Sequence, residues 1–186
     1  MTKTALILID IQNDYFNGGL MALDGMDAAT TNAARLLAGA RTRQEAVFHI
    51  RHIAGSPSAP FFRPGTMGSE IHATVRPVGG EMVIEKSRPN SFVGTGLEAA
   101  LRAAGIERVT LCGAMSQMCV DATARAAADL GFAVTVVADA CAAASVSFGG
   151  ISVPSEQVHA AIMAPLAASY GKVTTTGDIE GSSLTA

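Results

Sequence analysis

The sequence predicts an α/β fold, a three-layer sandwich with a central, mostly parallel six-stranded sheet and helices on both faces. Short apolar segments alternate along the chain with alanine-rich amphipathic segments, as in successive βαβ units. The apolar segment 5–9 is a continuous run rather than an alternating pattern, which is typical of a central parallel strand buried on both faces. A single domain over residues 1–186 accounts for a chain of this length.

Composition narrows the class of protein. Hydrophobic residues make up 49% of the chain and charged residues 16%, so we expect a compact globular protein. The net charge of −3 gives no electrostatic reason to expect nucleic acid as a partner. No apolar run approaches the roughly 18 residues that cross a bilayer, so we expect no membrane partner. The odd number of cysteines does not suggest a disulfide framework, and we expect a cytoplasmic protein.

The first part of the chain is expected to contain two strands, a helix and a long loop. Residues 5–9 are an apolar run that ends at Asp10, an acid that is either functional or a turn former. A helix capped by Asp27 should follow and end near residue 40. A second strand is expected over residues 46–50. The irregular stretch 51–80 is long enough to suggest a functional loop.

The middle of the chain repeats this arrangement. A third strand over residues 82–85 ends at Lys86, which either belongs to a site or is an ordinary solvated lysine. Thr95 and Glu98 match a capping box and predict a helix that ends near residue 104. A fourth strand over residues 109–112 follows.

A cysteine at the start of a helix is the central feature of the sequence. The fourth strand breaks at Gly113, and good helix formers run from about Cys119 to residue 130. Free N–H groups and the macrodipole favour an anion at a helix N-terminus, so the Cys119 thiol should lose its proton more easily there. The same N–H groups can stabilise an oxyanion. The alternative is a small structural cysteine packed under the helix.

The remaining elements complete the predicted sheet. A fifth strand is expected over residues 132–137, a loop or mobile connection over 140–153, a helix from Pro154–Ser155 to about residue 170, and a sixth strand over 172–176.

Three polar side chains should meet at one edge of this sheet. Asp10, Lys86 and Cys119 lie just beyond strands one, three and four, and ligands of such folds bind beyond the carboxyl ends of the strands. No G-x-G-x-x-G or Walker motif follows a strand, so a dinucleotide or nucleoside triphosphate has no motif support. We expect no cofactor.

Three motifs together resemble those of the isochorismatase-like cysteine hydrolases. They are Asp-x-Gln-Asn-Asp-Tyr at 10–15, Glu-Lys at 85–86 with Asn-Ser-Phe at 90–92, and Gly-Ala-Met-Ser-Gln-Met-Cys-Val at 113–120. The resemblance covers nearly the whole chain and implies an isochorismatase-like, Rossmann-type fold. It also implies a catalytic triad of Asp10, Lys86 and Cys119.

The resemblance further implies a cis peptide at Ala114–Met115, which would turn the Met115 N–H toward the site. The Met115 and Cys119 amides would then form an oxyanion hole. In the implied mechanism Asp10 takes the Cys119 proton, Lys86 supports the thiolate, and the thiolate attacks a carbonyl to give a thioester.

Four further residues are candidates for contact with a small-molecule substrate: Tyr15, Phe62, Phe92 and Gln117. For Phe62 and its neighbour Phe61 the sequence leaves two interpretations, because the pair either lines a pocket or anchors the long loop to the core.

The sequence departs from the metal-binding members of the family. Nicotinamidases carry an Asp-x-His motif near the second strand, whereas this chain has His49-Ile-Arg-His52 there, with only His72 in the loop that follows. We therefore expect no metal.

Three functions remain open. Retention of Cys119 favours a cysteine-dependent hydrolase of a small amide, lactam or ureido compound. The second is an isochorismate-type vinyl-ether hydrolase, in which Asp10 protonates the substrate and Cys119 is a bystander. The third is a catalytically idle binding or thiol-sensing protein. The sequence does not indicate the substrate.

The C-terminal part of the chain suggests self-association. The last predicted helix is apolar on more than one side, and Phe148 and Ile151 lie in the connection before it. We expect a homo-oligomer, a dimer or tetramer, in which Phe148 packs at or near the active-site mouth of a neighbouring subunit. The alternative is that this connection folds over its own pocket.

Overall fold

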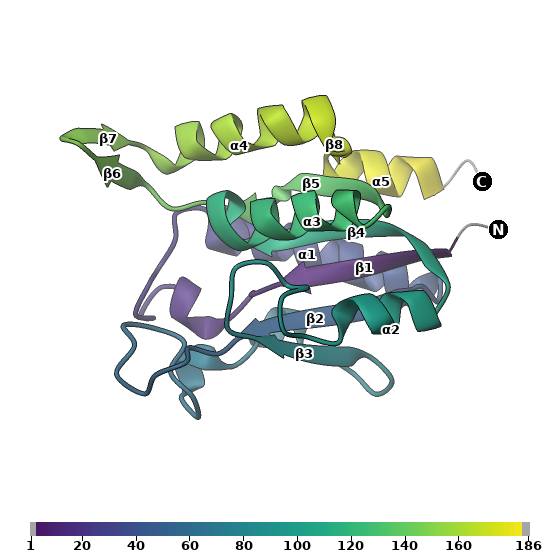
Figure 1. Ribbon diagram of the computed structural model, residues 1–186, viewed down its shortest axis with the longest axis horizontal. Helices are drawn as coiled ribbons and strands as arrows, with labels where there is room; N and C mark the ends of the chain where they lie inside the picture. The colour runs from purple at the N-terminus through teal and green to yellow at the C-terminus, as the bar shows by residue number, and fades with distance from the viewer. Residues whose placement is uncertain (1–2, 184–186) are drawn as a thin grey trace.

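The computed structural model describes residues 3–183 and shows a three-layer α/β sandwich (Figure 1). The central sheet has the strand order β3-β2-β1-β4-β5-β8, and every neighbouring pair is parallel, where the sequence predicted a mostly parallel sheet. Its strands are β1 (Lys3–Ile9), β2 (Ala46–His52), β3 (Met82–Lys86), β4 (Ile106–Ala114), β5 (Ala133–Ala142) and β8 (Lys172–Thr174).

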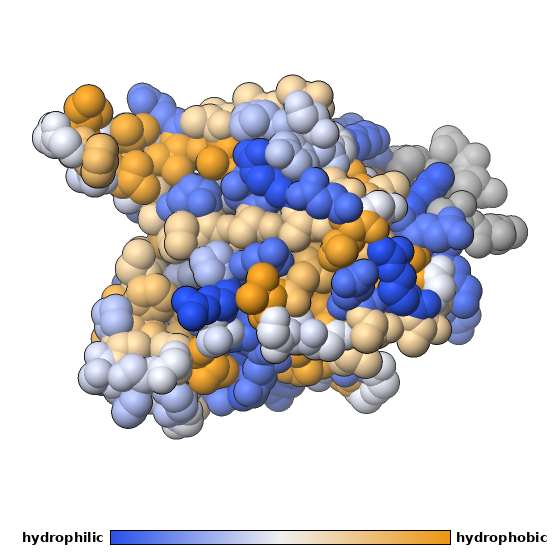
Figure 2. Space-filling model, in the orientation of Figure 1, coloured by the Kyte–Doolittle hydropathy of each residue, from blue (hydrophilic) through white to orange (hydrophobic). Residues whose placement is uncertain are grey.

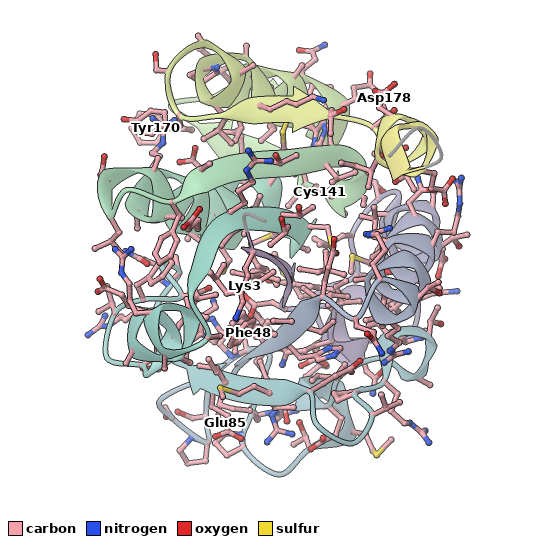
Figure 3. The ribbon with its side chains drawn as sticks, turned by 90° about the vertical axis from the view of Figure 1, so that its right-hand side faces the viewer. Lys3, Phe48, Glu85, Cys141, Tyr170 and Asp178 are labelled. Carbon is pink, nitrogen blue, oxygen red and sulfur yellow. The ribbon has the colours of Figure 1, made fainter. Side chains whose placement is uncertain are left out.

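The helices cover both faces of the sheet, as Figure 3 shows in a view along the strands. On one face lie α1 and α5, and on the other lie α2, α3 and α4. Their bounds are α1 (Met26–Thr42), α2 (Leu97–Ala103), α3 (Asp121–Asp129), α4 (Ser155–Ser169) and α5 (Thr176–Ser183). Short 3₁₀ turns are η1 (Asn13–Tyr15), η2 (Met67–Ser69) and η3 (Ala73–Val75), and a π turn, η4 (Ser116–Val120), joins β4 to α3. Among the described residues, no helix is both long and apolar enough to cross a membrane.

The centre of the sheet is fully buried. Residues 5–9 of β1 are at most 2% exposed, which explains why that strand is a continuous apolar run. The strand order reverses between β1 and β4, because β1, β2 and β3 extend in one direction and β4, β5 and β8 in the other. Ligand sites of doubly wound sheets lie at the carboxyl ends of the strands beside such a reversal. The candidate site therefore belongs at the ends of β1 and β4.

Gly113 lets β4 lie very close to β1 at this point. Its φ is +125°, and a Cβ built there would lie 2.0 Å from the Ile9 carbonyl oxygen. The pairing of β4 with β5 is interrupted between Leu111 and Gly113, and resumes with Gly113 opposite Cys141. Only glycine combines this backbone angle with this approach.

Residues 140–153 are more ordered than the sequence predicted. β5 continues to Ala142, so that Cys141 lies buried in the sheet rather than in a loop near the mouth. A two-stranded hairpin follows, formed by β6 (Val146–Phe148) and β7 (Ile151–Val153). Its two turn residues, Gly149 and Gly150, both have positive φ, as a type I′ turn requires. The predicted mobile loop is therefore a hairpin.

Two predicted helix caps are also corrected. Gly25, in a left-handed conformation, is the N-cap of α1, and Asp27 lies in the first turn. Gly96 is the N-cap of α2, so the capping box is not formed, although the Thr95 hydroxyl accepts a bond of 3.3 Å from the Leu97 N–H. The last helix, α5, was not predicted at all.

Candidate active site

Asp10, Lys86 and Cys119 converge at the carboxyl edge of the sheet, as their places after strands one, three and four predicted. Asp10 follows β1, Lys86 is the last residue of β3, and Cys119 lies in the π turn between β4 and α3. The Lys86 Nζ is 2.7 Å from Asp10 Oδ2 and 3.1 Å from Cys119 Sγ. All three side chains are buried. A buried ion pair adds little net stability, so this cluster is better explained by chemistry than by folding.

The backbone of Asp10 turns its carboxylate into the cluster. Its φ is +51°, in the left-handed region that aspartate tolerates better than most residues. Its N–H donates to the Ile50 carbonyl at 3.0 Å, which joins the end of β1 to β2. Asp10 is therefore a specifically placed carboxylate and not an exposed turn former.

The π turn between β4 and α3 holds Cys119 in the cluster. The Ala114–Met115 peptide is cis, as the resemblance implied. The Met115 carbonyl accepts bonds from the N–H groups of Met118 at 3.1 Å and Val120 at 3.2 Å. Regular α-helix begins only at Asp121, so Cys119 lies in the π turn before it rather than in the first turn of α3.

The Lys86 ammonium contacts more acceptors than it has protons. Besides Asp10 and Cys119, it lies 3.1 Å from the Arg88 carbonyl oxygen and 3.1 Å from His52 Nδ1. An ammonium carries three N–H donors, so it cannot satisfy four acceptors at once.

The pKa of Cys119 is raised above the usual range of a thiol, contrary to the prediction from its helix position. Burial raises it most, the neighbouring Asp10 carboxylate raises it further, and the Lys86 ammonium opposes both. Cys119 is therefore a thiol in the resting cluster. Its proton has a nearby acceptor in the Asp10 carboxylate, whose charge the Lys86 ammonium balances.

His52 and Gln12 complete the cluster, and neither was predicted to have a role in it. His52 ends β2, where it pairs in register with Lys86. The fully buried Gln12 side chain accepts from the His52 N–H at 2.8 Å and donates to the His52 carbonyl at 2.9 Å. A signal was present in the sequence, because His52 lies two residues beyond the apolar run of the second predicted strand, close to where Asp10 and Lys86 follow theirs.

Tyr15 and Phe62 lie beside the cluster as a packed pair. Their rings meet edge to face with centroids 4.7 Å apart, and both side chains are buried. Burial raises the pKa of Tyr15, and the nearby Asp10 and Cys119 raise it further. The Phe62 N–H donates to Asp14 Oδ2 at 2.6 Å, which ties the long loop to the turn after β1. Phe62 thus anchors the loop, while substrate contact by either residue stays a prediction.

The other two predicted substrate contacts make different interactions. The Phe92 ring stacks on Phe132, which immediately precedes β5. Phe132 is therefore at the amino end of β5, whereas Asp10, Lys86 and Cys119 lie at the carboxyl edge of the sheet. This contact does not support the predicted role of Phe92 in substrate binding. The Gln117 side-chain amide donates to the Ala144 carbonyl at 3.2 Å and accepts from the Ala144 N–H at 3.4 Å. It joins the π turn to the segment before the hairpin.

Of the three histidines considered from the sequence, His49 and His72 make other contacts and His52 lies in the cluster. His49 Nε2 lies 2.9 Å from Glu81 Oε2, and His72 stacks on Phe16. Donor atoms of Asp10, His52 and Cys119 lie within 4.8 Å of one another. The Lys86 ammonium contacts all three of these groups, and its charge would repel a cation among them.

Comparisons with known proteins agree with this geometry. Residues 4–178 match the model of the isochorismatase domain family. The isochorismatase family protein YddQ of Bacillus subtilis, described as uncharacterized, is 47% identical over 173 residues, which cover 93% of this chain and 96% of that protein. A crystal structure of an isochorismatase hydrolase from Oleispira antarctica superimposes with a TM-score of 0.92 at 44% identity and covers 96% of both chains.

Two relatives have names that state an activity. The streptothricin hydrolase of Streptomyces noursei is 38% identical over 136 residues, which cover 73% of this chain and 48% of that protein. The ureidoacrylate amidohydrolase RutB of Variovorax paradoxus is 27% identical over 191 residues, which cover 85% of this chain and 74% of that protein.

Proposed function

The chain belongs to the isochorismatase family of hydrolases, and from this we propose that it is a cysteine-dependent hydrolase of a small amide, lactam or ureido compound. The observation that carries the proposal is the buried contact of one ammonium with a carboxylate and a thiol, Lys86 with Asp10 and Cys119. Such a cluster supplies a nucleophile, a proton acceptor and a cation that balances the charge of either. An amidohydrolase among the relatives supports the choice of an amide.

The first half of the reaction forms a thioester. Asp10 accepts the thiol proton of Cys119, and the sulfur attacks the substrate carbonyl carbon, so that a C–S bond forms and the carbonyl oxygen becomes an oxyanion. The backbone N–H groups of Met115 and Cys119 are the proposed donors to that oxyanion. The C–N bond then breaks, and the departing amine takes the proton from Asp10.

The second half releases the acid. Asp10 accepts a proton from a water molecule, whose oxygen attacks the thioester carbonyl. The C–S bond breaks, and Cys119 recovers its proton from Asp10. Throughout, Lys86 is a charge partner that stabilises whichever of the two groups is anionic. Over one cycle Asp10 and Cys119 exchange protons with each other, with the departing amine and with the attacking water, so the cluster ends in its starting protonation state.

The test is a panel of small primary amides, N-carbamoyl acids, lactams and isochorismate, assayed for ammonia release and by mass spectrometry for new products. Cys119→Ala should lose at least about a thousandfold in amide turnover, since it removes the covalent nucleophile. Cys141→Ala is the matched control, because Cys141 is also buried but lies in β5 outside the cluster, and it should keep its activity.

The alternatives give different results. A vinyl-ether hydrolase would convert isochorismate and keep its turnover in Cys119→Ala, with Asp10 as the essential acid. A binding or thiol-sensing protein would convert no member of the panel. Amide turnover that survives in Cys119→Ala would contradict the proposal.

A further inference from the structure

We propose that His52 is a positioning residue of this site, which holds the Lys86 ammonium so that its remaining proton serves either Asp10 or Cys119. The inference rests on the proposed function, because it concerns how the thiol is activated. It adds a fourth side chain to the cluster, contributed by β2.

Strand register places His52 beside Lys86. The two are paired residues of the parallel strands β2 and β3, and His52 Nδ1 lies 3.1 Å from Lys86 Nζ. One ring nitrogen of His52 is also within 4.8 Å of both the Asp10 carboxylate and Cys119 Sγ. The imidazole therefore borders the same small volume as the triad.

Counting protons shows what His52 contributes. The Arg88 carbonyl and His52 Nδ1 each accept from the Lys86 ammonium at 3.1 Å, which uses two of its three protons. One proton is left for Asp10 and Cys119. While Cys119 is a thiol this proton faces the Asp10 carboxylate, and once Asp10 has taken the thiol proton it can turn to the sulfur. Two fixed acceptors thus restrict the third proton to the two groups that exchange charge.

This role requires a neutral imidazole. Nδ1 can accept from an ammonium only when it is unprotonated, which assigns the ring hydrogen to Nε2. Burial lowers the pKa of His52, and the adjacent Lys86 charge lowers it further, while Asp10 opposes both. Tyr15 and Cys119 are the other titratable groups of the cluster, and each is kept protonated by its raised pKa.

The backbone of His52 does not depend on its ring. Gln12 binds the His52 N–H and carbonyl through its side-chain amide, and the Gln12 amide also donates to the Ser69 carbonyl at 2.8 Å. The end of β2 should therefore keep its place when the imidazole is replaced. A substitution of His52 should therefore report on the loss of the imidazole and not on a change in the backbone.

The experiment measures the reactivity of Cys119 in the free protein, so it needs no substrate. The rate of iodoacetamide labelling at Cys119 is followed by mass spectrometry between about pH 6 and 9, the range in which an ordinary thiol begins to ionise. His52→Leu removes the acceptor at similar volume, and His52→Asn offers an oxygen at about the place of Nδ1. His72→Leu is the control, since His72 stacks on Phe16 outside the cluster. Thermal melting confirms that each variant is folded.

At about pH 7 we expect His52→Leu to label about tenfold more slowly than the wild type, the equivalent of one hydrogen bond to a charged group. The rate of this variant should also rise steeply with pH, as that of an ordinary thiol does. His52→Asn should recover most of the wild-type rate, and His72→Leu should equal the wild type. A His52→Leu protein with wild-type labelling overturns the inference, and so does an equal loss in the Leu and Asn variants, which would indicate a packing role. Failure of the proposed function shows separately, as amide turnover that survives Cys119→Ala.

Discussion

Cys119 keeps its proton in the resting cluster, because burial and the Asp10 carboxylate together outweigh the Lys86 ammonium. Its thiolate then arises by transfer of the proton to Asp10 and not by loss to solvent. Such a transfer leaves the total number of protons in the cluster unchanged, so the thiolate population does not depend on pH while the cluster holds that number.

This reasoning predicts the pH profile of alkylation. Iodoacetamide should label Cys119 at a nearly constant rate from about pH 6 to 9, whereas the rate of an ordinary thiol rises about tenfold per pH unit below its pKa. Cys112 and Cys141 should stay unlabelled after brief treatment, since burial raises the pKa of each and neither contacts the Lys86 ammonium that would stabilise a thiolate. Peptide mapping by mass spectrometry measures all three sites. A rate at Cys119 that climbs steeply with pH, or earlier labelling of Cys141, would contradict this mechanism.

The positions of Asp10, Lys86 and Cys119 could be predicted from the sequence, but the protonation state of Cys119 could not. Asp10, Lys86 and Cys119 each follow a strand, and that topology alone brings them to one edge. The pKa of Cys119 depends instead on how completely the long loop and the π turn exclude water. Burial of this kind comes from packing between segments distant in sequence, such as the Tyr15 and Phe62 contact, and has no local signal.

At the element scale, β1 was predictable because its continuous apolar run reports burial on both faces, whereas the apolar run of the edge strand β3 leaves Met82 and Val83 exposed. The β6–β7 hairpin was missed although Gly149-Gly150 between two short runs that contain β-branched residues is a hairpin pattern. In the described part of the chain, its side chains are exposed apart from the partly covered Val153. Helix α5 was missed because Thr176, Gly177 and Gly181 are poor helix formers. It is held by tertiary contacts, among them the ion pair of Arg35 on α1 with Glu180.

At Gly113, where β4 lies against β1, adding a single methyl group should strongly lower the stability of the protein. Gly113→Ala places a methyl group against the Ile9 carbonyl and imposes an unfavourable φ. We expect it to lower the free energy of unfolding by about 3 kcal/mol or more, since strain and overpacking add. Urea denaturation measures the change. Gly79→Ala is the control, because Gly79 has open space and no left-handed φ, and it should be near neutral. Equal stability of the two variants would show that β4 can move away from β1.

At the scale of the whole molecule, the hairpin extends beyond the body of the fold (Figure 1), and its surface is strongly hydrophobic (Figure 2). Phe148 is 91% exposed and Ile151 is 69% exposed. The outer side of α4, which follows directly, adds exposed alanines such as Ala160 and Ala164. A contiguous apolar surface of this kind usually marks an interface. The hairpin extends away from its own subunit and leaves Phe148 exposed, so we propose that a second copy of the chain covers it, with Phe148 near that copy's active-site mouth.

This proposal predicts the mass of the protein in solution. Light scattering at low micromolar concentration should give at least twice the chain mass of 19.0 kDa. Phe148→Asp places a charge in the centre of the proposed interface and should shift the mass toward the monomer, because burying an unpaired carboxylate is costly. Val78→Asp, in an exposed loop outside the hairpin and α4, is the matched control and should leave the mass unchanged.

If Phe148 completes a neighbouring site, the mass and the amide turnover of Phe148→Asp should fall together as the protein is diluted. A wild-type protein that is monomeric and fully active would exclude this assembly.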